Sequence, residues 1–318
     1  MSGSEGHDRS WQRRPDTVGD DVFRFVAGLE QGLADRYTAT CVRRTAVLHR
    51  FASPGDGPDV VVKVLAEPAG AQAVFDAGMR LAALLEDGGQ AAPLPIRALR
   101  PWAVADNLPA VAMPWLDDPS IRDVVTARPD RIDELMERAG VALAVVHERA
   151  AAAPGGTLAV SARTRLLTTP KAGGSGSALV RRHVDFHPHN LLVGERWLTA
   201  IDPPGGDEFT YVHHDMVNFL YKTQKNLLAG SWGTARLSGA MHLVAPTMAF
   251  FRGYFATSSR VMTDDDAKMI DRYLRLYIRL RNRDARRRRD VVQSGVFGPL
   301  LRWQVRRAFG LTAGSQHR

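Results

Sequence analysis

Three polar side chains occur in an order that could serve chemistry on a phosphate group. Asp185 stands in the segment HVDFHPHN, five residues before Asn190, and the aliphatic run LLV follows. Asp202 comes after a second short apolar run, WLTAI. Transfer of a phosphoryl group to a hydroxyl needs a carboxylate beside the hydroxyl and hard oxygen ligands for a divalent metal. The spacing therefore predicts a loop that carries Asp185 and a hairpin that brings Asn190 and Asp202 together.

A lysine within an apolar strand supplies the cation that this reaction also needs. Lys63 lies in the run VVVKVL, where it could bind the phosphates of a nucleotide that are not transferred. Each residue alone has a simpler explanation, since Lys63 could lie on the polar face of an edge strand and Asp202 could be a turn residue. Because order, spacing and strand context agree for all of them, we interpret the set as that of a phosphotransferase.

Three histidines surround Asp185. His183 is expected to hold the loop by hydrogen bonds, and His187 could contact the phosphate that is transferred. His189 is expected to face solvent. A zinc site made of the three histidines is an alternative, but no fourth ligand with suitable spacing accompanies them.

The sequences HVDFHPHNLLV and WLTAIDP resemble the aminoglycoside phosphotransferase family, and the second is especially similar to its streptomycin and hydroxyurea branch. The similarity is strong from Arg182 to Pro203 and weaker at Lys63, in the segment VAMPWL and at Asp215. It implies a bilobal, protein-kinase-like α+β fold, with a small antiparallel-sheet N-lobe and a larger helical C-lobe. It also implies ATP and Mg²⁺ as cofactors.

The resemblance assigns roles to individual residues. It implies that Asp185 is the catalytic base, that Asn190 and Asp202 hold magnesium, and that Lys63 binds the α- and β-phosphates. Asp215 would cap a helix and anchor the loop.

The adenine would be received by the backbone near Met113 to Trp115. The acidic partner of Lys63 is expected in or near the helix after its strand, where Asp76 is favoured over two glutamates, Glu67 and Glu86.

Two departures from the family pattern concern the loops. Val184 replaces the usual glycine of the catalytic loop, and the first hairpin has no glycine-rich phosphate loop. That hairpin instead carries Arg43 and Arg44, which either contact phosphate or face solvent.

The order of apolar patterns predicts a sheet-rich first part and a helix-rich second part. We expect a disordered tail over 1–19, a nucleotide-binding N-lobe over 20–115 and a catalytic and substrate-binding C-lobe over 116–318. The predicted strands lie within 37–51 and at 60–65, 96–99, 110–113, 191–193 and 197–201. The predicted helices cover 20–33, 69–86, 132–152, 215–229, 241–256 and 264–283.

Composition sets limits on compartment and partners. The 318 residues include one cysteine, Cys41, which excludes an internal disulfide, and the polar N-terminus lacks the apolar core of a signal peptide. No apolar run approaches the length of a membrane span. We therefore expect a cytoplasmic protein, and its net charge of +8 favours acidic partners.

The C-terminal segment is strongly basic, with arginines throughout Arg272 to Arg289 and again from Arg302 to Arg307. It is either a solvated helical face or a surface for an anionic membrane or a lipid-linked acceptor, which would place the protein at the membrane periphery. Nucleic acid is not expected, since no nucleic-acid-binding module is present. The charge favours a neutral or anionic acceptor, whereas the family resemblance favours cationic antibiotics.

These observations predict an ATP- and Mg²⁺-dependent phosphotransferase that acts on a hydroxyl of a small, sugar-like molecule. A nucleotide-binding pseudokinase or scaffold, docked through the basic tail, is the alternative. A protein kinase fits less well, because the interval from Asp202 to Asp215 is too short for a typical activation segment.

Overall fold

The computed structural model describes residues 18–42, 46–86, 94–150, 179–181, 186–202, 209–229, 244–259, 263–287 and 298–316. The chain divides into two units. The first comprises Met1–Asp87, Ala98–Asp118 and Ile201–Gly206. The second comprises Gly88–Arg97, Pro119–Ala200 and Asp207–Arg318.

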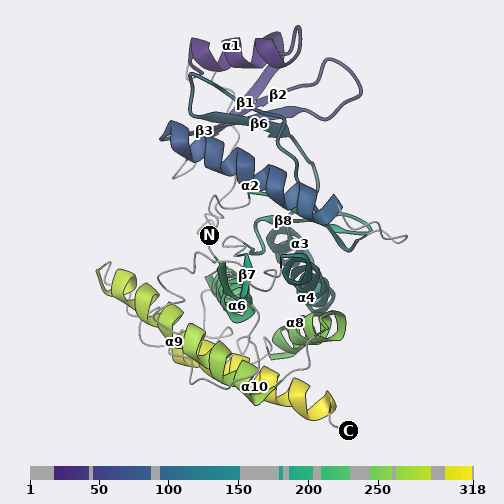
Figure 1. The fold of residues 1–318 in the computed structure, drawn as a ribbon, viewed down its shortest axis with the longest axis vertical. Coiled ribbons are helices and arrows are strands. Elements are labelled where there is room, and N and C mark those ends of the chain that lie inside the picture. The colour runs from purple at the N-terminus through teal and green to yellow at the C-terminus, as the bar shows by residue number, and fades with distance from the viewer. Residues whose placement is uncertain are drawn as a thin grey trace, which may run out of the picture. The chain divides into compact units, whose positions relative to one another are not determined.

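The first unit is built on a five-stranded antiparallel sheet with the order β1-β2-β3-β6-β5 (Figure 1). Two helices, α1 and α2, accompany it. The strands are β1 (Tyr37–Val42), β2 (Ala46–Phe51), β3 (Val60–Leu65), β5 (Ala103–Val104) and β6 (Ala110–Pro114). The helices are α1 (Asp20–Leu29) and α2 (Pro68–Glu86), and a 3-10 turn covers Ala34–Arg36.

Alternation along β3 gives the sheet two different faces. Val60 and Val62 point into a core that also contains Val22 and Val26 of α1, so this helix covers one face. Because successive side chains point to opposite sides of a strand, Val61 and Lys63 belong to the other face. The sequence of β3 therefore directs one charged side chain away from the α1 core.

The second unit is mainly helical. Its helices are α3 (Ile121–Ala127), α4 (Ile132–Arg149), α6 (Val212–Ala229), α8 (Val244–Thr257), α9 (Asp264–Arg287) and α10 (Gly298–Gln316). A small sheet has the order β4-β9-β8, and a second sheet pairs β10 with β7. These strands are β4 (Ile96–Ala98), β7 (Leu179–Arg181), β8 (Leu191–Val193), β9 (Leu198–Ala200) and β10 (Phe209–Tyr211).

Two glycines let α4 and α8 approach each other closely. A Cβ atom on Gly140 would lie 2.1 Å from the carbonyl oxygen of Phe250, and one on Gly253 would lie 2.2 Å from that of Glu137. Neither position can carry a side chain unless the helices separate. This reciprocal contact joins two helices that are distant in the sequence.

The predicted α+β fold class, with an antiparallel sheet in the first part and mostly helices in the second, is confirmed by this architecture. The predicted strands 60–65 and 191–193 agree with β3 and β8. The first helix was predicted to reach Leu33, but α1 ends at Leu29, because Glu30 is extended and Gly32 has a φ of 80°. Strand β5 and helix α3 were not predicted as separate elements.

The predicted division at residue 115 into an N-lobe and a C-lobe stays a prediction. None of the helices in the described ranges is long and apolar enough to cross a bilayer.

Candidate functional site

Lys63 and Met113 lie on the same face of the five-stranded sheet. Lys63 pairs with Leu48 on one side and Val111 on the other, and Met113 pairs with Val61. All of these positions share the face opposite the α1 core. The fold thus brings the predicted phosphate-binding lysine and the predicted adenine segment to one surface of the first unit.

The ammonium group of Lys63 donates a hydrogen bond to the carboxylate of Asp202, which lies 139 residues later in the chain. Both residues belong to the first unit. The Lys63 side chain is 13% exposed and that of Asp202 is 42% exposed. The pair therefore leaves a large part of the carboxylate accessible to a ligand.

Asp202 has a left-handed backbone, with a φ of 53°. Among residues other than glycine, only asparagine and aspartate adopt this conformation with some frequency. Strand β9 ends at Ala200, which pairs with Leu191 of β8. The turn at Asp202 directs the chain out of the hairpin immediately after that pairing, and strained backbone of this kind is concentrated at functional sites.

The segment after β6 is fixed by a small cluster of charged and aromatic groups. The amide of Trp115 donates to the carbonyl of Asp59 at 2.6 Å, and its indole donates to Asp117 at 2.6 Å. The Arg50 guanidinium lies 4.7 Å from the Trp115 ring and bonds to the Asp59 carboxylate at 2.8 Å. The backbone amide of Trp115 is therefore already occupied.

Backbone groups point alternately to the two sides of β6, so a carbonyl near Trp115 is directed away from β3. The carbonyl of Ala112 accepts from Trp102, beside β5, whereas the amide of Trp115 points towards β3. By this alternation the carbonyl of Pro114 points to the side of β5. In the segment predicted to receive adenine, Pro114 therefore carries the acceptor that is directed away from β3.

Asp76 bonds to a neighbour on its own helix. Its carboxylate accepts a hydrogen bond of 2.8 Å from Gln72, one turn earlier in α2, and this pair is exposed. Within the described residues Lys63 bonds to Asp202 and not to Asp76. The role proposed for Asp76 stays a prediction from the sequence.

Asp185 and His183 lie outside the described residues, and the structure describes the loop from Phe186 onward. Phe186 is completely buried, and its ring lies 5.6 Å from that of Phe219 in α6. The Phe219 ring stacks on Phe250 of α8 at 4.9 Å. The residue after the predicted base is thus anchored in the core of the second unit.

The loop beyond Phe186 is ordered by its own backbone. Nδ1 of His187 accepts from the amide of His189 at 3.2 Å, so the proton of the neutral ring is on Nε2. The amide of Asn190 donates to the carbonyl of His187 at 2.9 Å. His187 and His189 are both half-buried, so part of the His189 side chain remains exposed.

Helix α3 and the residue before its cap hold this loop and β8 through backbone hydrogen bonds. Ser120 caps the helix, with a capping box formed with Asp123. The amide of Arg122 donates to the carbonyl of Pro188 at 3.2 Å, and the amide of Val193 donates to that of Pro119 at 2.8 Å. The spacing Ser-x-x-Asp is a capping signal that could have identified this helix from the sequence.

Asp215 lies in the first turn of α6 and is fully buried. His214 Nδ1 donates to its carboxylate at 3.2 Å and His147 Nε2 at 3.4 Å, while His147 Nδ1 accepts from Tyr254 at 2.9 Å. Burial raises the pKa of the Asp215 carboxyl, but the bonds from His147 and His214 outweigh this effect and lower the pKa below its ordinary value. Asp215 is therefore ionised, and its hydrogen bond with His147 joins α6 to α4.

The donors that the sequence assigns to a metal are of the right chemical type. Asp202 offers a partly exposed carboxylate and Asn190 an amide oxygen, both of which suit Mg²⁺. Among the described residues, no group of three or more His, Cys, Asp or Glu side chains could hold a metal ion. A nucleotide-bound Mg²⁺ needs only one or two protein ligands, so this donor set fits it.

No protein-family model matches the sequence, and no curated protein matches it significantly. Solved structures do share its fold. An aminoglycoside phosphotransferase from Alicyclobacillus acidocaldarius is 13% identical with a TM-score of 0.52, covering 92% of this chain and 96% of its own. The macrolide 2'-phosphotransferase of Brachybacterium faecium is also 13% identical, with a TM-score of 0.51 and coverage of 87% and 97%.

A spectinomycin phosphotransferase solved with ADP and spectinomycin is 11% identical, with a TM-score of 0.51, covering 93% of this chain and 98% of its own. The resemblance read from the sequence to aminoglycoside phosphotransferases is thus confirmed at the level of the fold. At these identities the comparison establishes the fold, and the chemistry must be argued from this chain's own residues.

Proposed function

We propose that the protein is an ATP- and Mg²⁺-dependent phosphotransferase that transfers the γ-phosphate to a hydroxyl of a small, sugar-like molecule. The observation that carries the proposal is the bond between Lys63 and Asp202. This bond supports the proposal, because Lys63 would bind phosphates and Asp202 would bind the metal that neutralises them. The left-handed backbone of Asp202 supports a functional role, because a turn without function would favour glycine here.

The nucleotide would lie against the sheet face that carries Lys63 and Met113. Lys63 would bind the non-transferred phosphates, and its bond to Asp202 would be exchanged for bonds to phosphate oxygens. The carbonyl of Pro114 would accept from the adenine amino group. Mg²⁺, when bound, would neutralise charge on the transferred phosphate, and Asp202 and Asn190 would be its protein ligands.

Asp185 would orient the acceptor hydroxyl and take its proton. Phe186 supports this role, because its burial against Phe219 fixes the chain immediately beside the base. Nδ1 of His187 accepts from the amide of His189, so Nε2 carries the proton of the neutral ring and would donate it to an oxygen of the transferred phosphate. His187 would thus stabilise charge rather than move a proton.

The test is Mg²⁺-dependent consumption of ATP across a panel of hydroxyl acceptors. Asp185→Ala should abolish transfer while the protein still folds and binds nucleotide, because only the proton acceptor is lost. Lys63→Met should mainly raise the KM for ATP. The matched control is Asp106→Asn, an exposed aspartate in the turn before β6, which should keep full activity.

Two results would contradict the proposal. Near-normal turnover of Asp185→Ala would show that another group is the base. Tight binding of nucleotide by the wild type without transfer to any acceptor would instead favour the nucleotide-binding scaffold.

The acceptor is a matter for the same panel. The three structures described above are named for an aminoglycoside, a macrolide and spectinomycin, so the fold accommodates different acceptors. Aminocyclitols, neutral sugars and sugar phosphates should be compared, because they differ in charge while each offers a hydroxyl. Preference for a neutral or anionic acceptor is expected from the basic C-terminal segment.

A further inference from the structure

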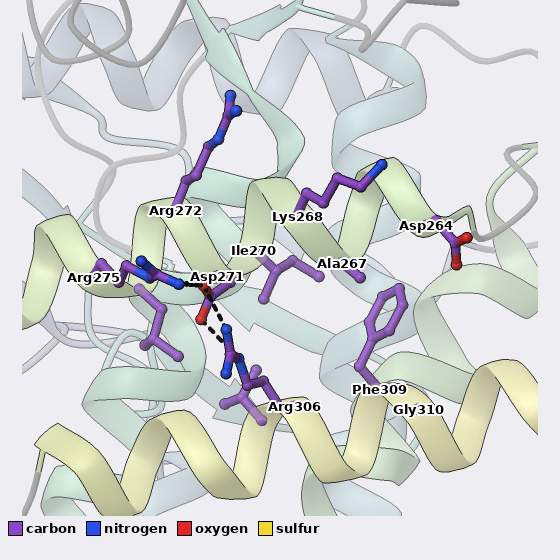
Figure 2. Close-up of a pocket in the computed structure, with 12 residues that line it drawn as sticks. Asp264, Ala267, Lys268, Ile270, Asp271, Arg272, Arg275, Arg306, Phe309 and Gly310 are labelled. Carbon is purple, nitrogen blue, oxygen red and sulfur yellow. Dashed lines mark hydrogen bonds and ion pairs between the residues drawn. The ribbon is translucent and has the colours of Figure 1, made fainter.

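A groove between α9 and α10 in the second unit has a volume of about 700 Å³ (Figure 2). This is the size of a site for a small molecule. Its apolar lining comes from Ala267, Ile270, Leu274, Val305 and Phe309. Its basic lining comes from Lys268, Arg272, Arg275 and Arg306.

One carboxylate in this groove holds three arginines together. Asp271 accepts from Arg275 at 2.8 Å, from Arg302 at 3.0 Å and from both Nε and a terminal nitrogen of Arg306 at 2.9 Å. The Asp271 side chain is 12% exposed, whereas those of Arg275 and Arg306 are 53% and 57% exposed. The carboxylate thus forms the base of the cluster, and the side chains of Arg275 and Arg306 remain open to solvent.

The cluster carries more positive than negative charge. Burial raises the pKa of Asp271, but its bonds to the arginines outweigh this effect and lower the pKa, so Asp271 is ionised. Three guanidinium groups then share a single negative charge, which leaves two positive charges without compensation. The neighbouring Lys268 is neutralised by Asp265 at 2.8 Å, and Asp264 lies at the other end of the groove (Figure 2).

Arg272 adds a further cation to the rim. It makes no hydrogen bond or ion pair with any of the described residues, and it extends away from Asp271 (Figure 2). The excess charge at the groove is therefore not removed by the surrounding side chains that the structure describes.

We propose that this groove binds a phosphate monoester through Arg275 and Arg306, with Arg302 completing the cluster on Asp271. A monoester dianion supplies the two negative charges that the cluster lacks, and its oxygens match the paired N–H groups of arginine. Arg306 has five N–H groups and spends two on Asp271, so three remain for a ligand. The apolar lining accommodates the carbon part of the ester, and Asp271 fixes the arginines before the ligand arrives.

The monoester could be a soluble compound or the headgroup of phosphatidic acid. Trp303 is 41% exposed on α10, and the Arg307 guanidinium lies 5.9 Å from its ring. An exposed tryptophan beside arginine suits the interface of a membrane, so vesicles belong in the test. Neither source depends on the phosphotransferase activity proposed above.

The experiment is calorimetric titration of the full-length protein with glycerol phosphate at low salt. We expect saturable binding that strengthens as the pH rises from 5.5 to 8, because the second ionisation of a monoester has a pKa of about 6. Arg306→Gln and Arg275→Gln should each weaken binding about tenfold. Arg252→Gln is the matched control, since Arg252 is similarly exposed but neutralised by Glu137 at 3.0 Å.

Absence of saturable binding, or equal weakening by Arg306→Gln and Arg252→Gln, would overturn the proposal. In a second arm, vesicles containing phosphatidic acid are sedimented with the protein. If glycerol phosphate releases the protein from these vesicles, the groove accepts a monoester from either source. If the protein stays on the vesicles, the groove is assigned to the lipid headgroup. Phosphatidylglycerol is a diester and serves as the comparison lipid. If the protein binds it equally well and Arg306→Gln has no effect, the surface attracts anions in general, which would contradict a monoester site.

Discussion

Asp202 and Asp215 are both aspartates paired with nitrogen bases, yet they differ in almost every physical respect. Asp202 is 42% exposed, bonds to one lysine and has a left-handed backbone. Asp215 is fully buried in regular helix and is bonded to His147 and His214. The first carboxylate keeps oxygen atoms available, and the second has its oxygens engaged.

This difference separates a residue that we propose to bind a ligand from one whose bonds join two helices. A pair with one partly exposed member, such as Lys63 and Asp202, is expected to contribute little to stability, about 1 kcal/mol or less. Removal of one partner of a buried pair costs roughly 3 to 5 kcal/mol. If the comparison is right, substitutions at the two aspartates should affect different measurements.

The largest effect is expected for Asp202→Asn on activity. Asparagine tolerates the left-handed backbone but lacks the charge that Mg²⁺ and Lys63 require. We expect kcat/KM to fall by about 10³-fold, which is roughly 4 kcal/mol, while the free energy of unfolding changes by less than about 1 kcal/mol. Steady-state kinetics and urea unfolding of the same preparation measure both quantities; a stability loss as large as the activity loss would abolish the comparison.

The next effect is expected for Asp215→Asn on stability. The substitution removes the charge that His147 and His214 stabilise inside the second unit, so the free energy of unfolding should fall by about 3 kcal/mol. Urea unfolding measures it, with Asp130→Asn in an exposed pair with Arg128 as the control. An unfolding midpoint equal to that of the control would show that the buried network is dispensable.

Asp266 is a second buried carboxylate, and it makes the stability of the fold depend on pH. Burial raises the pKa of Asp266, but bonds from His213 and Thr263 lower it to about 2 from an ordinary value of 3.8. Because the folded-state pKa is depressed, the stability it provides is present above pH 4 and is lost as the pH falls towards 2. The loss should be roughly 2 kcal/mol.

Acid titration of unfolding, with wild type and Asp266→Asn compared, measures this effect. The variant should be less stable near pH 6 and should converge with the wild type near pH 2. Parallel curves over the whole range would show that Asp266 ionises alike in the folded and unfolded chains.

The smallest effect is expected at the N-terminus of α9. Thr263 caps the helix by accepting from the amide of Asp266 at 3.3 Å. Thr263→Ala should cost about 1 kcal/mol in thermal or urea unfolding. Thr126→Ala, which removes a hydroxyl that bonds within its own helix, should cost less, and a larger loss there would contradict the assignment of the cap.

Local pattern explains why some elements were predicted well. Strands β3 and β8 are short apolar runs bounded by turn residues, so the neighbouring sequence predicts both that they are strands and where they end. Strand β5 has two residues, Ala103 and Val104, and no periodicity can reveal so short an element. Its existence depends on pairing with β6, which is a tertiary contact.

The candidate site shows the same limit. The sequence identified Lys63 and Asp202 individually, but it favoured Asp76 as the acidic partner of the lysine, because Asp76 precedes Met79 at a spacing like that of the family it resembles. The bond that the structure shows joins Lys63 to Asp202 across 139 residues, and no local pattern predicts such a contact. The clustering of Arg275, Arg302 and Arg306 on Asp271 was equally hidden, since it requires two helices to lie side by side.

The ring contacts of Phe186 with Phe219 and of Phe219 with Phe250 have a consequence for synthesis of the chain. At 5 to 20 residues per second, a ribosome adds Phe250 about 3 to 13 seconds after Phe186. During that interval the segment beside Asp185 has left the peptidyl-transferase centre but lacks the aromatic ring that completes its support. The support of this segment is therefore completed late, after α8 has emerged. An arrested chain that ends before α8 should expose Phe186 to chaperones.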